Sequence, residues 1–160
     1  NYEYSELLAK IDMSLGGRVA EEVVFGQPTT GAESDIQQLT EIARHMVGRW
    51  GMSAAVGPLA VIPRDGSGPL LPGVAQASEH TQELVDSEVK RIVDEAHTRV
   101  GELLQANRDK LDGLVAALLE HETLDEDAAY EAAGVDHGAK ESGTKERQLA
   151  AAGRVIQSEP

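Results

Sequence analysis

Hydrophobic residues recur along most of the chain at spacings of three and four, which is the pattern of amphipathic α-helices. Five stretches of the chain are predicted to be helical, four long and one short. The short stretch is the last one; it has an N-cap at Thr123 or Asp125 and ends at Gly134, and glycine is common at the C-terminal end of helices. The pattern therefore predicts an all-α fold, a bundle of about five helices. The four longer stretches are residues 3–24, residues 29 to about 50, residues 78–107 and residues 109–121.

Two segments break the helical pattern. Residues 51–75 carry Gly or Pro every few positions, which excludes a helix and leaves a small hairpin or an ordered loop. From Val135 the chain is polar and glycine-containing, which is typical of a disordered tail, with one helical turn near Leu149. We therefore expect a helical domain over residues 1–134 and a flexible tail over residues 135–160.

The pair Gly16-Gly17 lies inside the first predicted helix. Each glycine costs about 1 kcal/mol relative to alanine in a helix interior. We therefore expect another backbone to pack very close to this pair.

Composition and charge narrow the functional classes. The chain has 160 residues, is 41% hydrophobic and carries a formal net charge of −14, so it suits one domain that binds no nucleic acid. There is no cysteine, which excludes disulfides, thiol chemistry and cysteine zinc sites. No run of about 18 apolar residues occurs, so we expect no membrane contact from this segment. The N-terminus does not resemble a signal peptide and suggests a piece of a longer chain.

The run "TTGAESDIQQ" at residues 29–38 has two interpretations. Thr30 with Glu33 fits a capping box, as does Ser34 with Gln37, and the helix dipole favours Asp35 in the first turn. Alternatively, Asp35 is a metal ligand, because a carboxylate fixed at a helix start suits an oxygen ligand of zinc. From these residues alone, capping is the stronger interpretation.

Other candidate residues are sparse. Glu21 and Glu22 are either a solvated acidic pair or include a residue that supports a metal site, and Arg18 is placed to pair with Glu22. No two histidines are spaced as H-x-x-x-H, so the zinc motif H-E-x-x-H is absent, as are a G-x-S-x-G elbow and a phosphate-binding loop. Isolated histidines are usually solvated, and no role is assigned to the following four: His45, His80, His97 and His121.

Several motifs in one order resemble the peptidase domain of FtsH-type ATP-dependent zinc metalloproteases. They are "LGGRVAEEVVFG" at residues 15–26, "TTGAESDIQQLTEIARHMVGRWGMS" at 29–53, "VGPL" at 56–59, and the helical stretch at 84–125. The resemblance covers about residues 5–133.

The resemblance implies a metal site to which this chain contributes one ligand. In the family, zinc is held by the two histidines of an H-E-x-x-H helix and by the aspartate of TGA-x-x-D, which is Asp35 here. The glutamate of that helix is the general base, so no catalytic residue is expected in this chain. Glu21, the first Glu of the AEE motif, is carried over only as a supporting residue near the site.

The resemblance also implies a larger assembly. Family members are membrane-anchored homo-hexamers on the cytoplasmic side of the bacterial inner membrane, and an AAA ATPase module uses ATP to feed them unfolded or damaged proteins. The helices at residues 78–133 would form the domain base and the hexamer contacts.

This chain also departs from the family pattern. The H-E-x-x-H helix and the ATPase module are expected upstream of Asn1. Within the loop at 60–76, "LLPG" at 70–73 replaces the usual aromatic-Leu-Gly motif. His45 and His97 stand where the family has other residues. These departures leave an alternative open, namely a non-catalytic helical assembly or regulatory module derived from such a protease.

Overall fold

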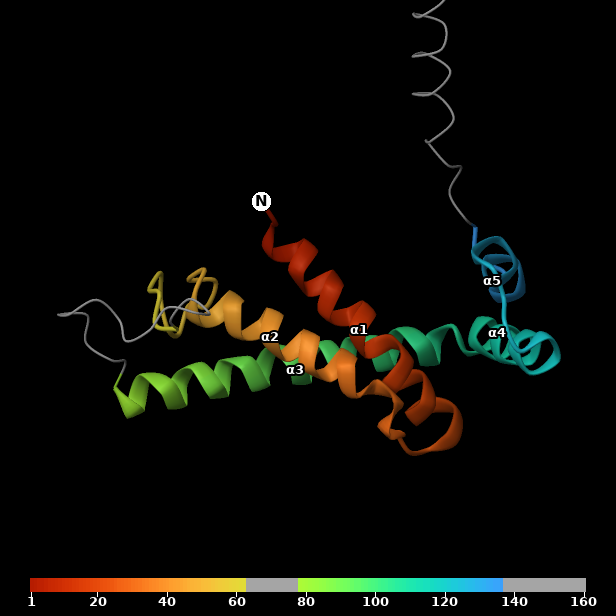
Figure 1. Ribbon diagram of the computed structural model, residues 1–160, viewed down its shortest axis with the longest axis horizontal. Helices are drawn as coiled ribbons and strands as arrows, with labels where there is room; N and C mark the ends of the chain where they lie inside the picture. Colours follow the sequence, from red (N-terminus) through yellow and green to blue (C-terminus); the bar gives the residue numbers. More distant parts are fainter. Residues whose placement is uncertain (63–77, 137–160) are drawn as a thin grey trace, which may run out of the picture. The chain divides into compact units, whose positions relative to one another are not determined.

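Every regular element is a helix in the computed structural model, which describes residues 1–62 and 78–136 (Figure 1). The all-α prediction is confirmed, and no strand occurs in these two ranges. The second half of the expected hairpin, most of the loop at 60–76 and the tail beyond residue 136 lie outside the described residues. The elements are α1 (Tyr4–Phe25), the 3-10 turn η1 (Thr30–Ala32), α2 (Glu33–Gly48), α3 (Glu79–Ala106), α4 (Arg108–His121) and α5 (Glu126–Ala133).

The chain divides into two compact units. The first, Asn1–Asn107, contains α1, η1, α2 and α3, and the second begins at Arg108 and contains α4 and α5. A single helical domain over residues 1–134 stays a prediction. Asp125 caps α5 by accepting a hydrogen bond from the Ala128 amide at 2.8 Å, and Gly134 ends it with φ +62°. The second unit buries no residue fully among those described.

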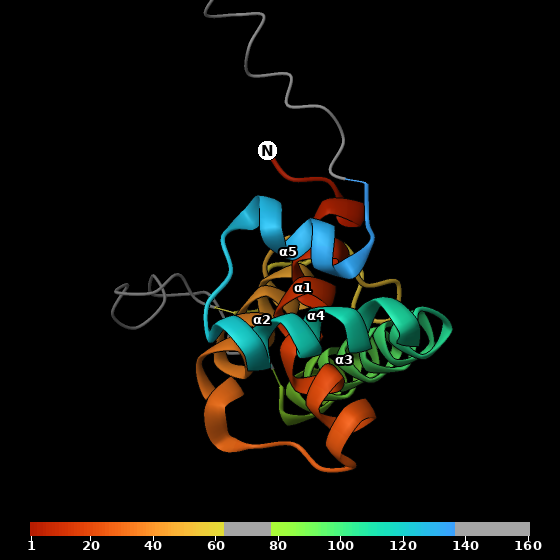
Figure 2. The same ribbon diagram turned by 90° about the vertical axis from the view of Figure 1, so that its right-hand side faces the viewer.

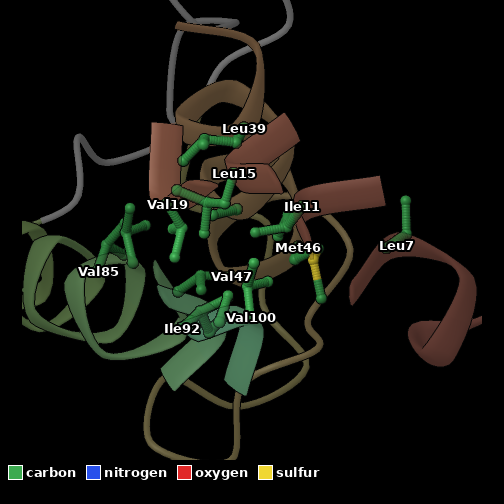
Figure 3. Packing of buried hydrophobic residues seen from close by; sticks show 13 residues of the cluster. Leu7, Ile11, Leu15, Val19, Leu39, Met46, Val47, Val85, Ile92 and Val100 are labelled. Carbon is green, nitrogen blue, oxygen red and sulfur yellow. The ribbon is translucent and has the colours of Figure 1, made fainter. Parts of the chain in front are cut away.

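The core of the first unit lies where α1, α2 and α3 pack against one another in pairs (Figure 2). The predicted apolar faces supply its side chains, and Figure 3 shows them gathered between the three helices. Some hydrophobic residues of the predicted helices lie outside the core, since Leu103 and Trp50 are 61% and 45% exposed. The buried cluster consists of Leu7, Ile11, Leu15, Val19, Leu39, Ala43, Met46, Val47, Val85, Val89, Ile92, Ala96 and Val100.

The chain after α2 folds back onto the end of that helix. α2 ends at Gly48, slightly before the predicted end near Trp50, and the amides of Val61 and Ile62 donate to the Gly48 carbonyl at 2.7 and 3.0 Å. A Cβ atom at Gly48 would lie 2.3 Å from the Ile62 side chain, so only glycine allows this approach. Residues 51–62 therefore form an ordered loop.

The expectation for Gly16 and Gly17 is wrong for the described structure. A Cβ atom at either position meets nothing within 4 Å. No described backbone therefore packs closely against them, and the two glycines carry only their helix-propensity cost.

We predict that Gly17→Ala raises the free energy of unfolding of the 160-residue chain by about 0.5–1 kcal/mol, because alanine restricts the unfolded chain and favours the helix. Urea denaturation followed by circular dichroism measures the change. Gly48→Ala, which clashes with Ile62, is the opposite control and destabilises the chain. A loss of stability in Gly17→Ala would contradict the open surface seen around α1.

A polar network fastens the loop to α3. Ser53 is 3% exposed, and its hydroxyl donates to Glu88 Oε2 at 2.7 Å. Arg91 donates to both oxygens of Glu88 at 3.0 Å and to Glu95 at 2.8 Å. The hydrogen bonds from Arg91, and then that from Ser53, lower the pKa of the Glu88 carboxyl. The buried hydroxyl is thereby satisfied, as buried polar groups generally are.

The lowered pKa of Glu88 makes the contribution of this carboxylate to stability depend on pH. The contribution of this carboxylate is complete above the unfolded-state pKa of about 4.3 and is lost as the pH falls through the lower folded-state pKa. We predict that Glu88→Gln lowers the free energy of unfolding by about 1 kcal/mol at pH 7 and that the deficit shrinks in acid. Urea titrations of both proteins between pH 3 and pH 7 measure it. A deficit that stays constant over this range would refute the assignment.

Candidate metal centre

Asp35 lies in the first turn of α2, directly after η1. Its side chain is half-buried, and its carboxylate makes no hydrogen bond or ion pair with any residue that the structure describes. The carboxylate does not cap the helix, because the N-cap position of α2 is Ala32, which has no side-chain cap. A half-buried carboxylate at a helix start, with no partner among the described residues, is available to bind a cation.

The predicted capping boxes at Thr30 and Ser34 are not formed. The turn is instead capped one residue earlier, where the Thr29 hydroxyl accepts a hydrogen bond from the Gly31 amide at 3.3 Å. The Glu33 amide donates to the Thr30 carbonyl and continues the turn into α2. Sequence spacing did not predict this arrangement because a 3-10 turn precedes the α-helix and shifts the cap.

Glu21 holds the start of this turn. Its Oε2 atom accepts hydrogen bonds from the Thr29 amide at 2.8 Å and from the Thr29 hydroxyl at 2.9 Å, and Oε1 lies 3.1 Å from the same hydroxyl. Thr29 therefore joins the end of α1 to the turn that leads into Asp35, along the loop seen in Figure 2. Glu21 makes this link through Thr29.

Glu22 points to different partners. Its Oε1 atom lies 3.2 Å from Arg18 Nε, which confirms the predicted pair, and its Oε2 atom lies 2.6 Å from His97 Nε2 on α3. The two neighbouring glutamates therefore have separate contacts, and neither is simply solvated. Sequence reasoning missed His97, because its partner lies 75 positions away in the chain.

The other histidines that the structure describes lie in separate surroundings. His45 Nε2 lies 3.5 Å from Arg49 Nη1, and its ring centroid lies 5.5 Å from that of Trp50. His121 Nε2 lies 3.9 Å from Glu120 Oε2, and His80 is exposed in the first turn of α3. None of them joins Asp35, and no group of three His, Cys, Asp or Glu side chains within residues 1–62 and 78–136 is arranged to hold a metal.

Asp35 therefore fits one position of a zinc site. Catalytic zinc takes three protein ligands and one open position, and a half-buried carboxylate at a helix start is a suitable oxygen ligand. Asp35 is therefore a candidate ligand, and the described residues offer no group of three side chains that would complete a site.

Comparison with known proteins identifies the class. Residues 1–131 match peptidase family M41. The ATP-dependent zinc metalloprotease FtsH 3 of Conexibacter woesei is 67% identical over 137 residues, which cover 86% of this chain and 18% of that protein. The FtsH metalloproteases of Syntrophus aciditrophicus and Burkholderia pseudomallei are 49% and 46% identical, over 79% and 77% of this chain and 18% and 19% of their own lengths.

The family match extends over most of the helical chain that the structure describes. The chain belongs to peptidase family M41. It spans about a fifth of the length of these relatives. None of the helices in the two described ranges is long and apolar enough to cross a membrane.

We predict that Thr29→Val lowers the free energy of unfolding by about 1–2 kcal/mol, because the variant keeps the shape of the side chain but loses its bonds to Glu21 and Gly31. Urea denaturation of the chain measures the change. Thr30→Val is the matched control, since it makes the same substitution at an exposed neighbour and removes no described side-chain hydrogen bond. Equal effects of the two variants would show that the contact with Glu21 does not stabilise the turn.

Proposed function

We propose that this chain is part of an ATP-dependent zinc metalloendopeptidase and supplies one zinc ligand, Asp35. The observation that carries the proposal is the carboxylate of Asp35, which is half-buried at a helix start and unengaged by any described residue. The match to peptidase family M41 supports it, as do the relatives named zinc metalloproteases. The same names favour a protease over a non-catalytic assembly or regulatory module.

The role of this chain's own residues is to place one anionic oxygen. Asp35 provides that oxygen, and Glu21 and Thr29 hold the turn from which it projects. When bound, zinc supplies a polarised water and an electrophile for the peptide carbonyl. No H-x-x-x-H pair occurs within these 160 residues. The proposal therefore assigns the two other ligands and the general base to parts of the enzyme outside them.

The remaining assignments follow from the family. We propose that the substrates are unfolded or damaged proteins, that ATP acts through a separate ATPase module, and that the intact protein is a homo-hexamer. The proposed location is the cytoplasmic side of a bacterial inner membrane. The net charge of −14 is consistent with a body that does not bind nucleic acids.

Asp35→Asn in the full-length protein tests the proposal. We expect bound zinc to fall to the background level and the hydrolysis of an unfolded protein such as casein to fall at least about 100-fold. This loss exceeds the 10- to 100-fold typical of residues that only support a ligand. The helical circular dichroism signal and the rate of ATP hydrolysis should stay close to those of the wild type. Elemental analysis and a protease assay measure the two losses.

Glu33→Gln is the matched control, since it removes a negative charge from the same first helical turn. It reproduces the change in the helix-dipole interaction, which is worth about 0.3–1 kcal/mol, without removing the proposed ligand. If Asp35→Asn retains zinc and proteolysis, or if both variants lose them equally, Asp35 is not a ligand.

A further inference from the structure

The last turn of α1 is connected to α3 by a polar contact. His97 Nε2 lies 2.6 Å from Glu22 Oε2, and the second oxygen of Glu22 lies 3.2 Å from Arg18 Nε. Both oxygens of the carboxylate therefore have partners, so the position of Glu22 is well defined. The side chains of Glu22 and His97 are 25% and 45% exposed, which places the contact at the edge of the core.

Apolar packing is thin where this contact lies. Val19 is the last fully buried residue of α1, and Phe25 at the end of the helix is 68% exposed. A cavity of about 340 Å³ opens beside the contact between α1 and α3, and it is lined by Val19, Val23, Glu22, His97, Thr98 and Gly101, among others. Val23 is only partly buried against the core here, and the contact between Glu22 and His97 adds a directional link between the end of α1 and α3.

The end of α1 in turn holds the turn before Asp35. Glu21, the neighbour of Glu22, accepts the hydrogen bonds of the Thr29 amide and hydroxyl. Thr29 caps η1, and Asp35 follows in the first turn of α2. Movement of the last turn of α1 would therefore move the point to which Thr29 is attached.

We propose that His97 is a positioning residue for Asp35. By donating a hydrogen bond to Glu22, His97 fixes the last turn of α1, from which Glu21 holds Thr29 and the start of α2. The effect on the metal rests on the proposed function, whereas the fastening of α1 to α3 does not depend on it. The inference assigns a task to a histidine that the family motifs do not include.

The experiment compares His97→Ala and His97→Gln in the full-length protein. Hydrogen exchange at the amides of Thr29 and Gly31 reports this attachment, because the Thr29 amide donates to Glu21 on α1 and the Gly31 amide donates to the Thr29 hydroxyl. We expect exchange to become about three- to ten-fold faster in His97→Ala, as for loss of a partly exposed hydrogen bond to a charged group. His97→Gln should restore nearly the wild-type rate, because its amide nitrogen donates from a similar position.

Release of zinc to a chelator reports the consequence for Asp35. We expect release to be several-fold faster in His97→Ala and close to the wild-type rate in His97→Gln. Rescue by glutamine distinguishes a donated hydrogen bond from general packing, because alanine and glutamine differ in that donor.

Arg99→Ala is the control for loss of another contact between the same two helices. Arg99 bonds both oxygens of Asp12 at 2.6 and 2.9 Å, ten positions before Glu22 on α1. We expect this variant to leave exchange at Thr29 and Gly31 unchanged relative to the wild type. Equal acceleration in His97→Ala and Arg99→Ala would overturn the proposal, since it would indicate only general destabilisation.

Four other results are decisive. The role of His97 in holding the end of α1 on α3 is refuted if exchange is unchanged in His97→Ala. It is also refuted if exchange in His97→Gln is as fast as in His97→Ala. Faster exchange with an unchanged rate of zinc release refutes the effect on Asp35. Retention of zinc by Asp35→Asn refutes the proposed function itself, and it does so independently of the exchange measured in the His97 variants.

Discussion

The first unit depends on the burial of one apolar face of α1 against α2 and α3. Leu7, Ile11, Leu15 and Val19 lie four residues apart and are at most 2% exposed. Full burial of an aliphatic side chain of this size contributes about 1.5–3 kcal/mol, so this face outweighs any single polar contact in the unit. It also fixes the direction of α1, and the polar contacts at the helix end can form only once that direction is set.

Polar contacts position the segments that the apolar face of α1 does not hold, namely the end of α1, the turn at Thr29 and the loop after α2. The buried face of α1 ends at Val19, and beyond it Glu22 contacts His97 while Glu21 holds Thr29. The Ser53–Glu88 bond has the same role for the loop after α2. Each such bond contributes only about 1 kcal/mol, yet its geometry decides where a loop or a helix start lies.

The periodicity was sufficient for the helices and for most of the core, because one face of each helix must be buried. It failed where two conformations compete over a few residues. Thr30 and Ser34 fit the spacing of a capping box, but Thr29 is the cap because η1 precedes α2. The Gly16-Gly17 pair suggested a close neighbour, and the described structure has none. Trp50 continued the pattern of α2 into a segment where the helix has already ended.

The sequence by itself determined the helical class, the apolar faces, the family resemblance and Asp35 as the candidate ligand, because all of these depend on residue type and local spacing. Only the tertiary structure decided what Glu21 and Glu22 contact. Their partners lie 8 and 75 positions away, and no local pattern records which of two adjacent carboxylates turns toward which helix. The tertiary structure also decided that the Asp35 carboxylate has no partner among the described residues, since this depends on everything that packs around it.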